Sequence, residues 1–375
     1  MNIRHIIEAI ESYAPRSFQE KWDNSGLQIA LPAGTDECTG VLVCLDVTEA
    51  IIAEAVARGC NLVVSHHPLI FKGFKNLTGS TPQQRAALAA VRAGVAVYSA
   101  HTSLDSTRGG VSYAMAELLG AEVTSALEPS EGLETVLTVI CPRRVSSDVR
   151  LLLLDRNAGA PLCAGNVPSE DNTACCSYAD SESESIAAPE PDTVPTIDIS
   201  HEPMCRVEAR IAVRDVDSVV AAVRALPGAA KSVFSTSGAL ADSSLGLGVF
   251  AVLPGTGMKG ADFAACVSEV FGCGAMRVSA GYRPDMTVRR IALCGGSGGE
   301  FIGKAVSAGV DAYVTADVRY HDFADIADAA CAVFDIGHFE SESCAKSILH
   351  RVITKKIPNF AVYYSESETN PVKYL

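Results

Sequence analysis

The chain has 375 residues, of which 48% are hydrophobic and 20% charged, and its net charge is −14. This composition is that of a globular protein, and the length suggests two or three domains. So acidic a surface repels phosphate backbones, which argues against non-specific nucleic-acid binding.

Other classes of protein are excluded by local patterns. No apolar stretch approaches the roughly 18 residues that a membrane-spanning helix needs, and charges interrupt the N-terminal segment, so we expect a cytoplasmic protein without a signal peptide. The 13 cysteines form no CxxC pair. They favour buried reduced thiols over a disulfide framework or a cysteine-ligated zinc site.

Strand-like and helix-like patterns alternate in the first and last parts of the chain. The isoleucines of residues 3–10 recur at helical spacing, which predicts an amphipathic helix at the start. The strands expected after it are 40–47, 61–65, 95–99, 288–294, 311–316 and 331–336. The helices between and after them are 48–59, 84–92, 109–119, 301–309, 323–330 and 343–354. Such alternation predicts an α/β domain with a mostly parallel sheet that helices cover on both faces.

The middle of the chain has a different character. Residues 133–142, 204–213 and 243–254 resemble half-buried antiparallel strands, and 215–226 resembles a helix. We therefore predict an α/β domain of residues 1–128 plus 282–375, interrupted by an inserted α+β domain, 129–281. Within the insert, 165–202 is rich in Ser, Glu, Asp and Pro, which predicts a mobile acidic loop.

Histidines follow three of the predicted strands, in SHHPLIF (His66, His67), SAHTSLD (His101) and DIGHFESE (His338). The carboxyl ends of strands line the ligand crevice of an α/β sheet, so these imidazoles are expected at one edge. Asp105 lies four residues after His101, and Glu342 lies four after His338. A single histidine of this kind is more often structural, but three with carboxylates attached favour a metal site.

Imidazole and carboxylate together suit divalent Zn, Mn, Fe, Ni or Co. The two carboxylates of Asp105 and Glu342 leave two divalent cations with positive charge to spare, which favours hydroxide and an anionic substrate. Because Pro68 breaks the strand after His66 and His67, the two neighbouring rings can each meet a different ion.

The sequence resembles the dinuclear-metal family called GTP cyclohydrolase 1 type 2, or NIF-three-like. The resemblance covers nearly all of the α/β domain. The matching stretches are WDNSGLQIA (22–30), GVLVCLDVT (40–48), NLVVSHHPLIFKG (61–73), YSAHTSLDSTRGGV (98–111), RRIALCGGSGGEFI (289–302), DAYVTADVRYHDFAD (311–325) and DIGHFESE (335–342).

The resemblance implies that five residues ligate two divalent ions, with zinc the first expectation. They are His66, His67, Asp105, His338 and Glu342, the last bridging both ions. It also implies that His101 and His321 carry protons or contact substrate, that the insert is PII-like with a ferredoxin-like fold, and that the protein is a homohexamer. The sequence departs from the family where HPYE is missing near 227–234 and where TGD reads TAD (315–317).

Three further segments leave two interpretations open. CGGSGG (294–299) is either a tight strand-to-helix turn or a wall of the substrate pocket. WDNSG (22–26) is either a turn or brings Asp23 near the site. His321, after Tyr320, either lies over the metals or caps a helix.

Two functions follow from these residues. The first is a metal-dependent hydrolase of a small anionic nucleotide or phosphoester, as the resemblance to GTP cyclohydrolase 1 type 2 implies. The alternative is a non-catalytic metal-binding assembly or regulatory protein whose insert senses a ligand. The net charge argues against a third, DNA binding through the centre of a hexamer.

Overall fold

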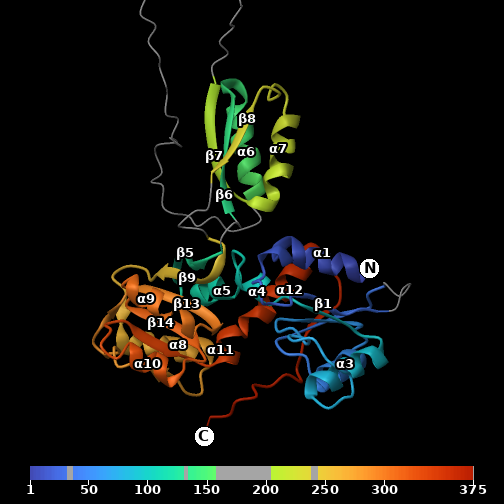
Figure 1. Cartoon of the computed structure of the whole chain (residues 1–375), viewed down its shortest axis with the longest axis vertical. Helices are drawn as coiled ribbons and strands as arrows, with labels where there is room; N and C mark the ends of the chain where they lie inside the picture. The colour runs from blue at the N-terminus through green and yellow to red at the C-terminus, as the bar shows by residue number, and fades with distance from the viewer. Residues whose placement is uncertain (32–36, 131–133, 158–203, 238–243, 375) are drawn as a thin grey trace, which may run out of the picture. The chain divides into compact units, whose positions relative to one another are not determined.

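The computed structural model describes residues 1–31, 37–130, 134–157, 204–237 and 244–374 (Figure 1). They divide into two compact units, the larger made of residues 1–130 and 241–375 and the smaller of 131–240. Both contain helices and strands, which confirms the α/β class with an inserted part. The acidic loop predicted at 165–202 lies outside the described residues. Among the helices described, none is long and apolar enough to cross a bilayer.

The first sheet of the larger unit is mostly parallel. In spatial order its strands are β1 (Gly26–Ile29), β4 (Ala96–Ser99), β3 (Leu62–Ser65), β2 (Val41–Cys44) and β16 (Val362–Tyr364). The pair β1–β4 is antiparallel, and the other three pairs are parallel. Strands β2, β3 and β4 are buried along their whole length, as expected of parallel strands covered on both faces.

The second sheet of the larger unit is mixed. Its order is β11 (Arg277–Val278), β15 (Ala332–Asp335), β14 (Ala312–Ala316), β13 (Arg290–Ser297), β9 (Gly246–Val252) and β5 (Glu122–Pro129). The central strands β13, β14 and β15 are parallel, and the remaining pairs are antiparallel. A short ladder joins β10 (Met258–Lys259) to β12 (Thr287–Val288). The larger unit therefore contains two principal sheets where the sequence suggested one.

Helices cover the outer faces of both sheets. Helices α2 (Glu49–Ala57) and α3 (Pro82–Ala93) pack on the first, and α9 (Ile302–Ser307) and α10 (Tyr320–Asp325) lie with the second. The ends of α3 follow from its sequence. Thr81 accepts a hydrogen bond from the Gln84 amide, Pro82 occupies the first turn, and Gly94 ends the helix with φ 65°.

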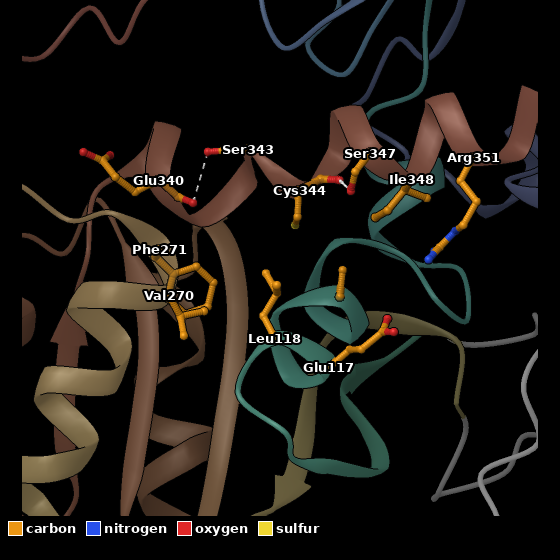
Figure 2. A pocket seen from close by; sticks show the side chains of 11 residues that line it. Glu117, Leu118, Val270, Phe271, Glu340, Ser343, Cys344, Ser347, Ile348 and Arg351 are labelled. Carbon is orange, nitrogen blue, oxygen red and sulfur yellow. Dashed lines mark hydrogen bonds between the residues drawn. The ribbon is translucent and has the colours of Figure 1, made fainter. Parts of the chain in front are cut away.

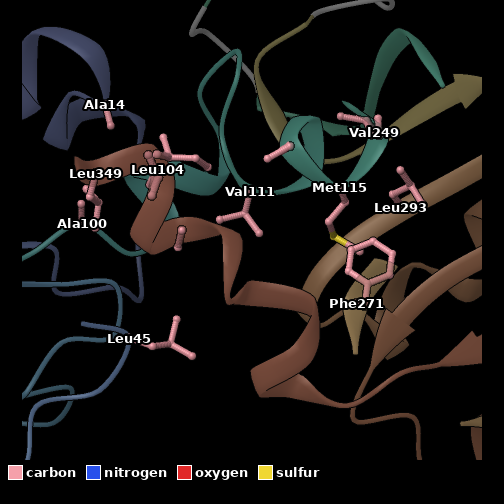
Figure 3. Packing of buried hydrophobic residues seen from close by; sticks show 14 of the residues in the cluster. Ala14, Leu45, Ala100, Leu104, Val111, Met115, Val249, Phe271, Leu293 and Leu349 are labelled. Atoms are coloured by element: carbon pink, nitrogen blue, oxygen red, sulfur yellow. The ribbon is translucent and has the colours of Figure 1, made fainter. Parts of the chain in front are cut away.

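The main core lies between the inner faces of the two sheets. Its helices include α1 (Ile3–Tyr13), α5 (Val111–Leu118), α8 (Gly260–Phe271) and α12 (Cys344–Lys356). Figure 3 shows Val111 and Met115 of α5 between Leu349 of α12 and Leu293 of β13, all buried. One continuous apolar core thus fixes the two sheets against each other.

The smaller unit has its own core and a three-stranded antiparallel sheet. Strand β6 (Glu134–Pro142) lies between β7 (Met204–Ala212) and β8 (Val233–Ser237). Helices α6 (Ser146–Asn157) and α7 (Val216–Ala225) complete the unit. Its α+β composition agrees with the sequence, and the finer likeness to PII-like proteins remains a prediction.

The predicted insert of residues 129–281 extends beyond the smaller unit, which ends near residue 240. Strand β9 pairs with β13 and β5 of the larger unit, and α8 contributes Phe263 and Val267 to the main core. The alternating pattern of β9 indicated a strand correctly, but such a pattern does not specify which sheet the strand joins. The predicted helix at 323–330 also differs, since α10 spans Tyr320–Asp325.

After β16 the chain is fixed to the first sheet by two carboxylates. Glu54 of α2 accepts hydrogen bonds from the Ser365 hydroxyl (2.7 Å) and from the amides of Glu366 (3.0 Å) and Ser367 (2.9 Å). Glu368 then accepts the amides of Leu45 (2.5 Å) and Asp46 (2.8 Å) just beyond β2 and pairs with Lys346. The C-terminal segment therefore holds the backbone that carries Asp46.

We predict that Glu54→Gln lowers the free energy of unfolding by about 1–3 kcal/mol at pH 7, because a carboxylate that accepts several hydrogen bonds is replaced by a neutral group. Burial opposes ionisation, but these hydrogen bonds outweigh it and lower the pKa of Glu54 to about 2. A lowered pKa stabilises the fold above the unfolded-state value of about 4.3, and this stabilisation is lost as the pH falls towards 2.

Urea unfolding at pH 7 and at pH 3 checks this. The difference between wild type and Glu54→Gln should shrink at the lower pH, and Glu8→Gln, at an exposed position on α1, should match wild type at both. A difference that is equal at both pH values would contradict the assignment.

Candidate metal centre

The candidate site lies where the carboxyl ends of parallel strands from both sheets meet. From the first sheet, Asp46 follows β2, His66 and His67 follow β3, and His101 follows β4. From the second, Gly296 lies near the end of β13, Asp317 follows β14, and α11 (His338–Glu342) follows β15. Every central parallel strand therefore delivers a residue to one place, as the general rule for α/β sheets predicts.

The imidazoles of this site converge with the carboxylate of Glu342. The Nε2 atom of His67 lies 2.7 Å from Glu342 Oε2 and 3.3 Å from His338 Nε2. His338 Nε2 is itself 3.0 Å from the same oxygen. Two overlapping groups of donor atoms could hold a cation, one formed by His66, His67 and His101 and the other by His67, His338 and Glu342.

Each imidazole is oriented by an oxygen at its Nδ1 atom. The partners are the Ala100 carbonyl for His66 (2.8 Å), Asp46 for His67 (2.8 Å), Asp23 for His101 (2.7 Å) and Asp317 for His338 (2.7 Å). With Nδ1 engaged, Nε2 of each ring is free to ligate, and the carboxylates make it a stronger donor. This is the usual outer arrangement around histidine ligands of metals.

The interior of the site contains polar atoms without a protein partner. His66 Nε2 and Asp105 Oδ1 are both buried and form no hydrogen bond within the described part of the chain. They lie 3.6 Å apart, and His66 Nε2 lies 3.7 Å from Glu342 Oε1. Two donors bound tetrahedrally to one zinc ion at about 2.1 Å would be about 3.4 Å apart. The spacing and chemistry of these atoms therefore fit a cation between them.

The charges of the site point the same way. The five carboxylates of Glu342, Asp105, Asp23, Asp46 and Asp317 face four imidazoles, and the first three are largely or fully buried. An uncompensated group of buried carboxylates is costly, so the site requires positive charge.

The pKa values of the site reflect this requirement. Burial alone would raise the pKa of Glu342, but the surrounding imidazoles outweigh it and hold the pKa well below its usual range. Burial raises the pKa of Asp105. Burial also opposes protonation of His67 and His338, yet two carboxylates around each ring raise the pKa of both to about 10. In the absence of cations, protons on the rings therefore supply the positive charge, and cations would displace them.

The glycine-rich segment of β13 forms part of the wall behind Glu342. Gly296 has φ 64°, and a Cβ atom there would clash with Glu342 Oε1. Its amide donates to the Ser341 hydroxyl at 2.9 Å. Of the two interpretations of CGGSGG, contact with the site is thus the one the structure supports for Gly296, because only glycine combines this backbone angle with so close an approach.

The structure brings the five predicted ligands, His66, His67, Asp105, His338 and Glu342, into one site. His101 belongs to one of the two donor groups, so its ring lies where it could ligate a cation. Asp23 of WDNSG lies at the site, bound to His101.

His321 does not join the other predicted residues. It lies exposed on α10 with its ring 5.4 Å from that of Tyr320, and neither donor group found among the described residues includes it.

Sequence reasoning missed Asp46 and Asp317 as partners of histidines. Asp317 directly follows the predicted strand 311–316, and Asp46 lies near the carboxyl end of the predicted strand 40–47. This position at the end of a strand was the signal that could have identified them. The departure from TGD to TAD places Ala316 at the end of β14 and leaves the Asp317 contact with His338 in place.

A separate pocket of about 430 Å³ lies among α5, α8, α11 and α12 (Figure 2). Its lining contains none of the candidate ligands. Three of its polar side chains already have partners, since Glu340 accepts from Asn370 and the Ser343 and Ser347 hydroxyls donate to backbone carbonyls. The histidine site therefore remains the candidate functional site.

Comparison with known proteins agrees with this geometry. The family described as Duf34/NIF3 (NGG1p interacting factor 3) matches residues 1–371. A Bacillus subtilis protein named GTP cyclohydrolase 1 type 2 homolog is 28% identical over 393 aligned positions, which cover 100% of this chain and 99% of the relative. A Mycobacterium leprae protein of the same name is 29% identical, with 90% and 86% covered.

Solved structures extend the likeness to the whole fold. A Bacillus cereus protein related to NIF3 has a TM-score of 0.72 at 26% identity, and 100% of this chain and 99% of that chain are covered. A Staphylococcus aureus protein has a TM-score of 0.67 at 24% identity with the same coverage, which supports the fold alone.

We predict that Gly296→Ala reduces the metal content of the purified protein, because the added methyl displaces Glu342. A left-handed backbone angle costs an alanine about 1–2 kcal/mol in addition. The matched control is Gly303→Ala in α9, where an added Cβ meets nothing within 4 Å. Elemental analysis after dialysis should show a loss in the first variant and wild-type metal in the second. Equal metal in both would show that Glu342 tolerates displacement or binds no ion.

Proposed function

Since the chain belongs to the Duf34/NIF3 family, we propose that it binds two divalent cations and uses them to hydrolyse a small anionic substrate. The observation that supports this most directly is that the two carboxylate oxygens of Glu342 face different histidines. Its Oε1 atom faces His66, and its Oε2 atom faces His67 and His338. One carboxylate thus connects two sets of donors.

On this basis His66, Asp105 and Glu342 Oε1 would hold one cation, and His67, His338 and Glu342 Oε2 would hold the other. Imidazole and carboxylate accept zinc, iron, manganese, cobalt or nickel, so zinc is the first metal to test. When bound, a pair of such ions supplies hydroxide at neutral pH and polarises the bond to be cleaved.

The remaining residues position groups and move protons. Asp23 is buried, and it accepts hydrogen bonds from the hydroxyls of Ser25 (2.7 Å) and Thr102 (2.6 Å) as well as from His101. This fixed carboxylate holds the His101 ring with Nε2 towards the ligands. In the proposed reaction, His101 would accept a proton from the attacking water or donate one to the leaving group.

The name GTP cyclohydrolase 1 type 2 homolog, which the relatives carry, makes GTP the first substrate to test. Phosphoesters come next, because the same donor set suits phosphoester cleavage. The homohexamer remains a prediction, and the mass of the protein in solution tests it.

The direct test is an assay of GTP and a panel of phosphoesters with protein loaded with each metal in turn. We expect metal-dependent turnover that falls at least about 100-fold in His67→Ala, which removes a ligand of one of the two proposed cations. His5→Ala, at an exposed position on α1, is the matched control and should keep wild-type rates.

If no metal supports turnover of any substrate, while chelation still lowers the melting temperature, the hydrolase proposal fails. That result would favour the non-catalytic alternative, in which the ions serve assembly or regulation.

A further inference from the structure

Two exposed aromatic side chains flank the candidate site beside His101. Trp22 is 58% exposed and Phe71 is 44% exposed. Their ring centroids lie 6.0 Å apart, and each lies 6.1 Å from the ring of His101. The three rings meet edge to face at 64–87°. In this arrangement large aromatic faces remain in water, which is unfavourable unless a ligand covers them.

Hydrogen bonds between their neighbours hold the two aromatic residues together. The side-chain amide of Asn24 donates to the Ile70 carbonyl at 2.6 Å, and the Ile70 amide donates to Gln28 Oε1 at 3.2 Å. The segment that carries Trp22 is therefore tied to the segment that carries Phe71. This arrangement orders the two rings before any ligand arrives, which lowers the entropic cost of binding.

The same two segments supply the metal site. Asp23, next to Trp22, orients His101. His66 and His67 precede Phe71 by only a few residues. The position of the rings relative to the candidate ligands is consequently fixed by short stretches of chain. The second segment also carries exposed Lys72 and Lys75, a local positive charge in a strongly acidic chain.

We propose that Trp22 and Phe71 form a stacking platform that binds a flat heteroaromatic ring of the substrate while its anionic part lies at the cations. This inference rests on the proposed function and adds the residues that select the substrate. An aromatic platform binds any ring with a π-face and does not distinguish the hydrogen-bonding groups at the edge of the ring. Adenine and guanine should therefore both bind. A ligand with the same sugar phosphate and no ring should bind weakly.

The test uses the fact that Trp22 is the only tryptophan of the chain, so its fluorescence reports on the platform alone. Metal-loaded protein is titrated with adenosine 5′-monophosphate, guanosine 5′-monophosphate and ribose 5-phosphate. We expect both nucleotides to quench the fluorescence and to bind about 10-fold or more tightly than ribose 5-phosphate.

Variants of Phe71 separate stacking from a structural role. Phe71→Leu should lose most of the preference for nucleotides and leave the affinity for ribose 5-phosphate unchanged, whereas Phe71→Tyr should behave as wild type. Tyr363→Leu, which removes a 40% exposed aromatic residue of β16, is the control away from the site.

The outcomes distinguish this inference from the proposed function. Equal affinity for nucleotides and ribose 5-phosphate, or an equal loss of both in Phe71→Leu, would overturn the platform even if hydrolysis is observed. Selective quenching by nucleotides without turnover of any substrate would support the platform and contradict the hydrolase. If none of the three ligands binds, the platform is overturned, and the turnover assay alone decides the hydrolase.

Discussion

The buried carboxylate of Glu342 is the interaction on which the site depends. It lies 5% exposed between imidazoles that come from different sheets, His66 and His67 from the first and His338 from the second. A carboxylate buried to this extent is stable only with positive charge beside it. The two sheets can approach at this edge because Gly296 leaves space for the carboxylate and because a continuous apolar core fixes the sheets elsewhere.

Hydrogen bonds between oxygen atoms and the histidine Nδ1 atoms explain how residues that follow separate strands form one ordered site. Each ring is fixed at Nδ1, and three of the four partners are aspartates that follow or precede a strand. The backbone around Asp46 is itself held by Glu368 of the C-terminal segment. Residues far from one another in the sequence therefore act together, since the position of His67 depends on a chain end about 300 residues away.

Most of the candidate metal ligands were predictable from the sequence because the ends of buried strands are easy to locate. The runs before His66, His101 and His338 are buried strands that end within one residue of the predicted position, and the carboxyl ends of parallel strands meet at one edge. What the sequence did not show was pairing. The pattern of residues 243–254 predicted the strand β9 but not its pairing with β13. The predicted insert was therefore too long. The family resemblance implied that His321 carries protons or contacts substrate, but α10 leaves its ring exposed and outside both groups of metal-binding atoms.

Anomalous scattering at metal absorption edges, from crystals grown without added metal, tests the central claim most directly. Our account predicts two peaks that share Glu342, one next to His66 and Asp105 and the other next to His67 and His338. Complete absence of anomalous signal at these side chains, with Glu342 bonded only to protonated imidazoles, would contradict it.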